Sequence, residues 1–251
     1  YQAGFGGGRK AVLPGCAAME TIRCSHQYMM DPRSGLGKTD GNPAYEDINE
    51  GVALWAKGKS VFMFNTILDA QHRFLKIFAG DYLKAHKEAC KYVETVNGVR
   101  IKEKTDIVIA SCGGYPKDIN VYQMQKTMDN ALLAVRNGGV VIILAECEEG
   151  PGSPVLMETC RRLGSIAAIE DDLRKNFKVG AHKAYTITRL MRNAKFILVT
   201  GIEKQMAQDL FFTGSFDNVP EALALAEKLT SKNASITLMP AGSLTVPIFE
   251  G

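Results

Sequence analysis

The residues near the start of the chain could hold an anionic ligand. Three consecutive glycines, Gly6, Gly7 and Gly8, are followed at once by Arg9 and Lys10. Consecutive glycines let a ligand approach the backbone closely, and their N–H groups can line an anion site to which the two cations add positive charge. The segment is not a Walker A loop, because the spacing differs and no Ser or Thr follows the lysine. A flexible segment with two solvated cations explains the same residues equally well.

His26 is a candidate metal ligand. Neutral imidazole is a common ligand for nickel, copper, zinc and iron. One histidine does not make a metal site, and Cys24, two residues earlier, is awkwardly spaced on a helix to be a second ligand. By residue type alone, a partly buried, hydrogen-bonded histidine is the commoner interpretation.

A third group of polar residues follows the glycine pair Gly113-Gly114. Gln123 and Lys126 are three residues apart and Tyr122 and Lys126 four apart, so on a helix all three are neighbours. A lysine point charge and an amide donor could together hold a small carboxylate. An exposed polar face of the helix is the alternative, although a double glycine at the carboxyl end of a strand favours a site.

Other polar residues carry weaker signals. We expect His72 and His86 at the surface. His182 and Lys183 follow a glycine in a predicted loop near strand ends, where a site role is possible but unsupported. Glu146, Glu148 and Glu149 follow a predicted strand and more often form a solvated loop.

Alternating strands and helices position the third group. Asp106–Ser111 is predicted to be a buried strand, followed by a helix over Val121–Val135 that Asn120 caps with Gln123 as capping-box partner. Gly138-Gly139 is expected to end that helix, and a strand should follow over 140–145. Further helices are predicted over 154–163, 185–191 and 220–229, and strands over 196–200 and 235–239.

Residues 1–100 and 101–251 are predicted to form separate domains, because the polar segment 97–105 reads as a boundary. Helices are expected over 17–29, 45–56 and 81–96 and a strand over 61–68. β-branched runs separated by helices indicate an α/β fold, with a Rossmann-like parallel or mixed sheet in the second domain preceded by a second α/β domain.

Composition excludes several classes of protein. The 251 residues are 46% hydrophobic and 23% charged with a net charge of +3, which is ordinary for a globular chain. No long Lys/Arg run indicates a nucleic-acid partner, and no apolar stretch is long enough to span a membrane. The six cysteines are scattered without a CxxC pair, which favours free thiols and a cytoplasmic location.

Taken together, these segments resemble the nickel-dependent lactate racemase family. The resemblance rests on Gly7-Gly8-Arg9-Lys10 followed by Pro14-Gly15, on His26, and on the pattern Gly-Gly-x-Pro-x-Asp-x-Asn-x-Tyr-Gln-x-x-Lys from Gly113 to Lys126. It covers essentially the whole chain, as the C-terminal portion of the family. Members use a nickel-pincer nucleotide, which is a nicotinate-derived mononucleotide with two sulfur arms.

The resemblance implies roles for individual residues. The cofactor-bearing lysine falls on Lys10 and the nickel-binding histidine on His26, with the glycine loop and Arg9 lying against the nucleotide. Tyr122, Gln123 and Lys126 match the motif whose glutamine and lysine contact the substrate carboxylate. The implied reaction is racemisation or epimerisation of a lactate-like 2-hydroxy acid, by removal and return of a hydride. The implied partners are that substrate and the enzymes that make the cofactor.

One departure from the family pattern keeps other interpretations open. The two acid/base histidines of the family are expected upstream of Tyr1, so we expect this chain to be a fragment that is inactive alone. The alternatives are a nicotinamide-dependent dehydrogenase, against which the missing GxGxxG fingerprint counts, and a non-catalytic paralogue that binds a nucleotide or hydroxy acid. The sequence does not predict an oligomeric state.

Overall fold

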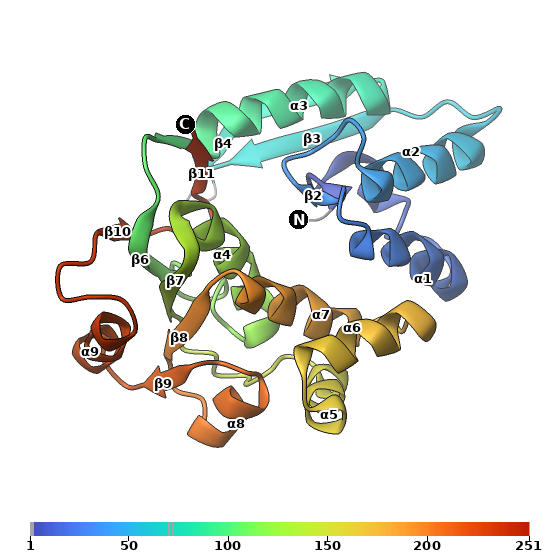
Figure 1. Ribbon diagram of the computed structural model, residues 1–251. Helices are drawn as coiled ribbons and strands as arrows, with labels where there is room; N and C mark the ends of the chain where they lie inside the picture. The colour runs from blue at the N-terminus through green and yellow to red at the C-terminus, as the bar shows by residue number, and fades with distance from the viewer. Residues whose placement is uncertain (1–2, 70, 72, 251) are drawn as a thin grey trace. The chain divides into compact units, whose positions relative to one another are not determined.

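The computed structural model of the protein describes residues 3–69, 71 and 73–250 (Figure 1). The chain divides into two compact units, Tyr1–Asn97 and Gly98–Gly251. Within the described part of the chain, no helix is both long enough and apolar enough to cross a membrane.

The second unit is built on a five-stranded parallel sheet with the order β10-β6-β7-β8-β9. The strands are β6 (Thr105–Ser111), β7 (Val135–Leu144), β8 (Lys195–Val199), β9 (Gly214–Phe216) and β10 (Ile236–Met239). Helices connect these strands in space, as parallel strands require. The predicted α/β fold with a parallel sheet is therefore confirmed.

Apolar side chains fill the interior of this sheet. Ile107, Val140 and Ile142 are fully buried and pack with Ala222 and Ala226 of α9 (Val219–Leu229). Burying each large aliphatic side chain stabilises the fold by about 1.5–3 kcal/mol, so the continuous β-branched runs explain why these segments form central strands. The remaining elements are α4 (Val121–Ala134), α5 (Pro154–Leu163), α6 (Ile166–Lys175), α7 (His182–Thr188), η3 (Arg189–Arg192), α8 (Lys204–Asp209) and the parallel pair β5 (Gly98–Ile101) and β11 (Val246–Phe249).

Helix α4 begins where its sequence pattern predicts but ends earlier than predicted. Met124 and Met128 are fully buried on one face, and the side chain of Asn120 accepts a hydrogen bond from the Gln123 backbone N–H. The predicted end at Gly138-Gly139 is wrong. The helix ends at Ala134, because Val135 already pairs with Thr105 of β6 and both glycines lie inside β7.

Local patterns predicted long elements better than short ones. The helix over Pro154–Leu163 is confirmed, with Gly164 in the left-handed conformation at φ 65°. The helix predicted over 185–191 begins earlier, at His182, and gives way to η3. Helix α8 and strands β5, β9 and β11 were not predicted, because they carry too few residues for a clear period. Helix α6 was missed as well, although it is as long as α5.

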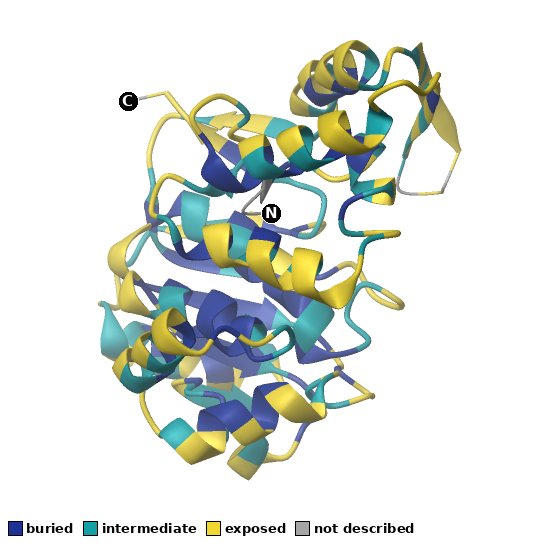
Figure 2. Cartoon of the chain, turned by 90° about the vertical axis from the view of Figure 1, so that its right-hand side faces the viewer, coloured by how far each residue is buried: buried dark blue, intermediate teal, exposed yellow. Residues whose placement is uncertain are grey.

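Smaller elements make up the first unit. They are the parallel pair β1 (Ala3–Gly4) and β2 (Gly35–Leu36), η1 (Gly8–Ala11), α1 (Met19–Gln27), η2 (Tyr28–Met30), α2 (Pro43–Ala56), the antiparallel pair β3 (Met63–Leu68) and β4 (Phe74–Gly80), and α3 (Tyr82–Asn97). Its core cluster is small, consisting of Leu13, Ala44, Ile48 and Val52. Buried residues line only part of these elements (Figure 2). The predicted strand and helices are present within two residues at each end, except that α1 is shorter and continues as η2.

A buried asparagine fixes the start of α2. The Asn42 side chain accepts hydrogen bonds from the backbone N–H groups of Ala44 and Tyr45, and its amide donates to the carbonyl oxygens of Gly35 and Lys38. One side chain therefore caps the helix and also holds the turn after β2.

Candidate functional site

The strand order of the second unit defines where a ligand would bind. The chain runs from β6 to β7 on one side and reaches β10, on the other side of β6, only at its end. The loops after β6 and β10 therefore leave neighbouring carboxyl ends in different directions. Crevices at such switch points are the usual ligand sites of open α/β sheets. Tyr122, Gln123 and Lys126 lie in the first two turns of α4, the helix that follows β6 (Figure 1).

Hydrogen bonds join the two loops at this switch point. The Gly242 N–H donates to the Ser111 carbonyl oxygen at 2.8 Å, and the Ser243 hydroxyl donates to the Cys112 carbonyl oxygen at 2.7 Å. A Cβ on Gly242 would lie 2.8 Å from a side-chain carbon of Thr127, so only glycine fits this close approach. Sequence reasoning missed both residues, although a Gly-Ser pair shortly after the last predicted strand was the available signal.

The loop after β7 fixes the start of α4. The Asn120 amide donates to a Glu149 carboxylate oxygen at 3.1 Å, while its oxygen caps the helix. The Cys147 N–H donates to the Asp118 carbonyl oxygen at 2.9 Å. Glu149 is thus exposed, as predicted, but it also supports the segment that carries the candidate residues.

Lys126 and Gln123 form a direct pair on the surface of α4. The Lys126 ammonium donates to the Gln123 side-chain oxygen at 2.8 Å. Because this contact uses the oxygen of the amide, the Gln123 NH2 group is the donor that an anionic ligand would meet. The expected capping-box contact from the Gln123 side chain is replaced by this pair. An ammonium and an amide donor side by side suit a carboxylate.

A buried polar network lies beside Tyr122. The Lys183 ammonium lies 4.0 Å from the Tyr122 ring centroid and donates to the Gln125 oxygen at 2.8 Å. The Gln125 amide contacts Asp129, which pairs with Arg189 at 2.8 Å. Burial raises the pKa of Tyr122, so its phenol stays protonated near neutral pH. The structure thus places Lys183 beside Tyr122, one of the predicted site residues. The neighbouring His182 instead accepts a hydrogen bond from the Gly180 N–H.

Burial also acts on the acidic member of this network. It raises the pKa of Asp129, while the charges of Arg189 and Lys183 act in the opposite direction. The ion pair of Asp129 with Arg189 joins α4 to η3 on the helix face that also carries Tyr122. The network is therefore a support for the candidate site rather than part of its exposed surface.

In the first unit, the glycine segment forms a tight loop that leads into η1. Gly7 and Gly8 have φ values of 73° and 55°, which L side chains rarely adopt. The Gly8 N–H donates to the Asn65 side-chain oxygen at 3.3 Å, and the Lys10 N–H donates to the Gly7 carbonyl oxygen. Gly6 and Gly7 are exposed and Lys10 is half-buried. A Cβ on Gly6 would meet open space, so this stretch of backbone is accessible.

Arg9 points into the first unit. It is 2% exposed, its guanidinium carbon lies 3.8 Å from the Tyr45 ring centroid, and one of its nitrogens lies 3.3 Å from each ring nitrogen of His86. The prediction of a surface position for His86 is wrong, because the glycine loop packs on the face of α3 that carries His86, Ala89 and Cys90, and His86 is 2% exposed. His72 lies outside the described residues.

His26 lies in the last turn of α1, half-buried, while Cys24 is exposed and contacts Arg23. Among the described residues, no three His, Cys, Asp or Glu side chains gather closely enough to hold a metal ion. The Lys10 amine, the His26 imidazole and the accessible backbone at Gly6 are the groups of this unit that could take part in holding a cofactor or metal.

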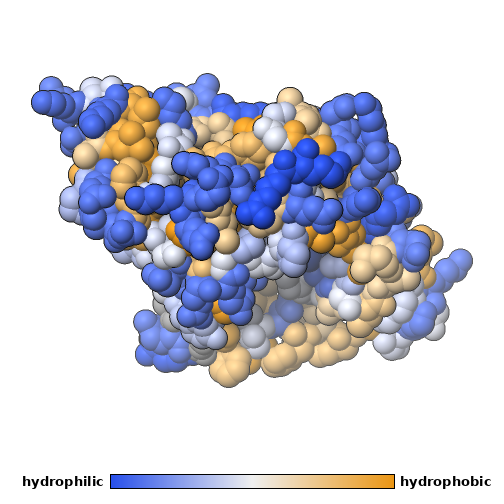
Figure 3. Space-filling model, turned by 90° about the horizontal axis from the view of Figure 1, so that it is seen from below, coloured by the Kyte–Doolittle hydropathy of each residue, from blue (hydrophilic) through white to orange (hydrophobic). Residues whose placement is uncertain are grey.

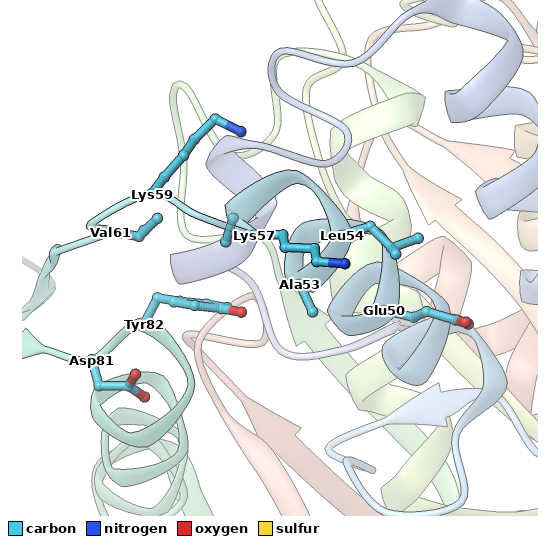
Figure 4. Close-up of a pocket in the computed structure, with 9 residues that line it drawn as sticks. Glu50, Ala53, Leu54, Lys57, Lys59, Val61, Asp81 and Tyr82 are labelled. Atoms are coloured by element: carbon cyan, nitrogen blue, oxygen red, sulfur yellow. The ribbon is translucent and has the colours of Figure 1, made fainter.

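A pocket of about 490 Å³ also lies in the first unit (Figure 4). It lies between the end of α2 and the start of α3, and the residues that line it include Glu50, Leu54, Lys57, Asp81 and Tyr82. Charges of both signs surround it, and none of the predicted site residues line it. The pocket is consequently not part of the candidate site.

These features define an α/β protein with a lysine-bearing glycine loop in one unit and, in the other, a helix that carries the Lys126–Gln123 pair and follows β6 at a sheet switch point. The family model described as the lactate racemase C-terminal domain matches residues 101–246, and the lactate racemase N-terminal domain matches residues 1–37. The chain belongs to the lactate racemase family.

Curated relatives and solved structures agree with this assignment. The chain is 33% identical over 252 residues to the lactate racemase of Thermoanaerobacterium thermosaccharolyticum, covering 96% of this chain and 57% of the relative. It is 36% identical to the lactate racemase of Lactiplantibacillus plantarum over 154 residues, covering 61% of this chain and 35% of the relative. The chain therefore spans little more than half the length of the longer-matching relative.

Structural similarity covers nearly the whole chain. The lactate racemase apoprotein from Thermoanaerobacterium thermosaccharolyticum aligns with a TM-score of 0.90 at 30% identity, covering 99% of this chain and 60% of that one. A Thermotoga maritima protein aligns with a TM-score of 0.71 at 17% identity, covering 99% of this chain and 64% of that one, which shows the shared fold alone.

Proposed function

We propose that the protein racemises or epimerises a 2-hydroxy carboxylic acid of the lactate type. The observation that carries this proposal is the Lys126–Gln123 pair at the start of α4, beyond the carboxyl end of β6. Two relatives named lactate racemase support it.

The substrate carboxylate would bind at α4. Lys126 supplies the charge, the Gln123 NH2 group supplies a directed hydrogen bond, and Tyr122 supplies a neutral phenol beside them. Fixing the carboxylate fixes the position of the adjacent α-carbon, which is a contribution from positioning. A charge-assisted hydrogen bond contributes about 1.5–3 kcal/mol, enough to dominate the affinity for so small a molecule.

The cofactor would bind in the first unit. We propose a nickel-pincer nucleotide attached to the amine of Lys10, with His26 as the protein ligand of nickel and the backbone of Gly6, Gly7 and Gly8 against the nucleotide. When bound, such a group would supply the acceptor for the α-hydrogen as hydride, while a base would have to take the hydroxyl proton to give the planar 2-keto acid, the role that the family resemblance assigns to its acid/base histidines. The family resemblance also assigns Arg9 to the cofactor loop, where its buried position suits support of Lys10.

Location and partners follow from the same proposal. All six cysteines are free thiols, which suits a cytoplasmic protein that meets the enzymes making its cofactor. Many surface cations are paired with acids, including Arg161 with Asp209 and Arg162 with Asp172. Hydrophilic and hydrophobic residues are interspersed on the face in Figure 3. We therefore propose a small-molecule partner and not a nucleic acid.

Intact-mass spectrometry with nickel analysis tests the proposal. The protein is expressed from its whole reading frame together with the cofactor-making enzymes. We expect a mass increment on the peptide that contains Lys10 and about one nickel per chain. An unmodified mass without nickel, beside a loaded positive control, would overturn the proposal. Tight NAD binding would then favour a dehydrogenase, and hydroxy-acid binding without exchange at the α-carbon a non-catalytic paralogue.

A further inference from the structure

A buried histidine contacts the glycine loop from α3. The Nε2 atom of His86 lies 2.9 Å from the Gly6 carbonyl oxygen, and a nitrogen of the Arg9 guanidinium lies 3.3 Å from its Nδ1. The Cys90 sulfur lies 3.5 Å from the same Nδ1. His86 is separated by 80 residues from Gly6 and by 77 from Arg9. It is therefore a long-range tie between a helix and the loop that precedes Lys10.

These contacts select one protonation state of the imidazole. A carbonyl oxygen only accepts hydrogen bonds, so Nε2 must carry the proton that is donated to Gly6. The Arg9 nitrogen lies 3.3 Å from both ring nitrogens, and because Nε2 donates to Gly6, Nδ1 is the nitrogen that can accept from Arg9, which has only donors. Burial raises the pKa of the Cys90 thiol to about 11, so that group also stays protonated and can donate to Nδ1. Neutral His86 with its proton on Nε2 suits the Gly6 contact and leaves Nδ1 as a single acceptor that Arg9 and Cys90 share.

The loop is held from two further elements as well. Tyr45 of α2 lies under the Arg9 guanidinium, and the Asn65 side chain of β3 accepts from the Gly8 N–H. A Cβ on Gly8 would lie 2.5 Å from His86 Cδ2, so the imidazole packs directly on the loop backbone. Arg9 is thus buried, and the Gly8 backbone is held by Asn65.

We propose that His86 is a positioning residue for the cofactor-bearing loop: by donating to Gly6 and accepting from Arg9, it fixes the loop so that Lys10 is presented for attachment of the cofactor. The link to Lys10 rests on the function proposed above. The hold on the loop itself does not.

The proposal predicts a particular dependence on pH. Burial is the largest influence that lowers the pKa of His86 below its ordinary value of 6.5, and the charge of Arg9 acts in the same direction. The titratable groups that face the imidazole are Arg9 from the loop, Tyr45 from α2 and Cys90 from its own helix. Because the folded state favours the neutral form, the hold is present above pH 6.5. It is lost as the pH falls and the imidazolium meets the guanidinium.

Hydrogen–deuterium exchange of the cofactor-free protein tests the hold on the loop. Amide protection of residues 4–12 is compared at pH 7.5 and 5.5 after correction for intrinsic exchange, with residues 121–134 as an internal reference. We expect wild-type loop protection to fall by up to about tenfold at the lower pH, which is the limit that linkage sets for one group with an ordinary pKa of 6.5. His86→Gln, which can donate to Gly6 and accept from Arg9 without titrating, should retain protection at both values.

His86→Leu should lack protection at both values, and Lys84→Ala, an exposed change on the same helix, should match the wild type. If His86→Leu does not fold, the pH dependence of loop protection in the wild type and in His86→Gln still tests the role of His86. Wild-type protection that does not change with pH, or a fall in His86→Gln as large as in the wild type, would overturn the proposal.

Cofactor attachment gives the second readout. The fraction of chains that carry the mass increment at Lys10 should be unchanged in His86→Gln and reduced about tenfold in His86→Leu. Absence of the increment in the wild type would refute the proposed function while exchange still decides the role of His86. A loaded wild type with equally loaded His86→Leu would overturn the positioning role and leave the proposed function intact.

Discussion

The two units position their candidate residues by different means. In the second unit, Tyr122, Gln123 and Lys126 share one helix, and a local cap and the spacing of the helix decide their arrangement. In the first unit, Lys10 lies on a loop whose shape depends on side chains from α2, α3 and β3. In the second unit, α4 rests on buried apolar side chains such as Met124 and Met128. In the first unit, the residues beneath the loop, Arg9 and His86, are polar and buried.

This difference has an energetic consequence. Removing an apolar side chain beneath α4 leaves a cavity but leaves the helical spacing unchanged. Removing a member of the cluster beneath the glycine loop leaves a buried donor or acceptor without its partner, which costs about 1–3 kcal/mol at the loop itself. We therefore expect the position of Lys10 in the first unit to depend on single polar contacts. In the second unit, the spacing of Gln123 and Lys126 should tolerate substitutions in the core beneath α4.

The largest effect should follow Lys10→Ala, which removes the amine that we propose carries the cofactor. No mass increment should remain on the peptide that contains residue 10. Lys10→Arg keeps the positive charge but not the primary amine and should fail equally. Lys57→Ala, an exposed lysine of the same unit, should load normally. An increment that persists in Lys10→Ala would show that attachment lies elsewhere.

His26→Ala should remove nickel while the nucleotide stays attached, because imidazole is the ligand that the protein supplies to the metal. Metal analysis and intact mass of the same sample measure both quantities. Cys24→Ala is the matched control, and its nickel content should equal that of the wild type. Unchanged nickel in His26→Ala would remove His26 from the site.

Met128→Ala should lower the free energy of unfolding by about 2–5 kcal/mol, because this fully buried side chain fills the space beneath α4. Urea unfolding followed by circular dichroism measures the loss. Leu132→Ala, at a half-buried position of the same helix, should cost less. Equal losses for the two variants would contradict the assigned core of the second unit.

Lys126→Ala should reduce kcat/KM about ten- to a hundredfold, mainly through KM, because one charge-assisted hydrogen bond to the substrate is lost. The measurement is racemisation by the loaded protein. Lys228→Ala removes an equally exposed lysine from α9 and should leave the kinetics unchanged. A wild-type KM in Lys126→Ala would argue against a carboxylate site on α4.

The smallest effect should follow Asn120→Ala, which removes the cap of α4 and costs about 1 kcal/mol of unfolding free energy. Asn120→Ser keeps an oxygen that can accept from the Gln123 N–H, so it should restore most of the loss. Urea unfolding compares the two variants. If they are equally destabilised, the cap does not set the start of the helix.

Sequence alone predicted most of the second unit because its signals are local. The β-branched runs of β6 and β7, the methionine stripe of α4 and the cap at Asn120 each depend on residues within one or two turns or one strand. The spacing of Gln123 and Lys126 was enough to predict that they would be neighbours. The glycines, Lys10 and His26 stood out by residue type and by the family pattern.

Only the tertiary structure decided which distant residues support these groups. It placed Lys183 on the ring of Tyr122, Gly242 against the end of β6, and His86 between Gly6 and Arg9. Such contacts join segments separated by about 60 to 130 residues and depend on how helices and strands pack. A helix period shows that His86 shares a face with Ala89 and Cys90, but not what covers that face. The sequence thus determined the residues that could do chemistry, and packing determined how they are held.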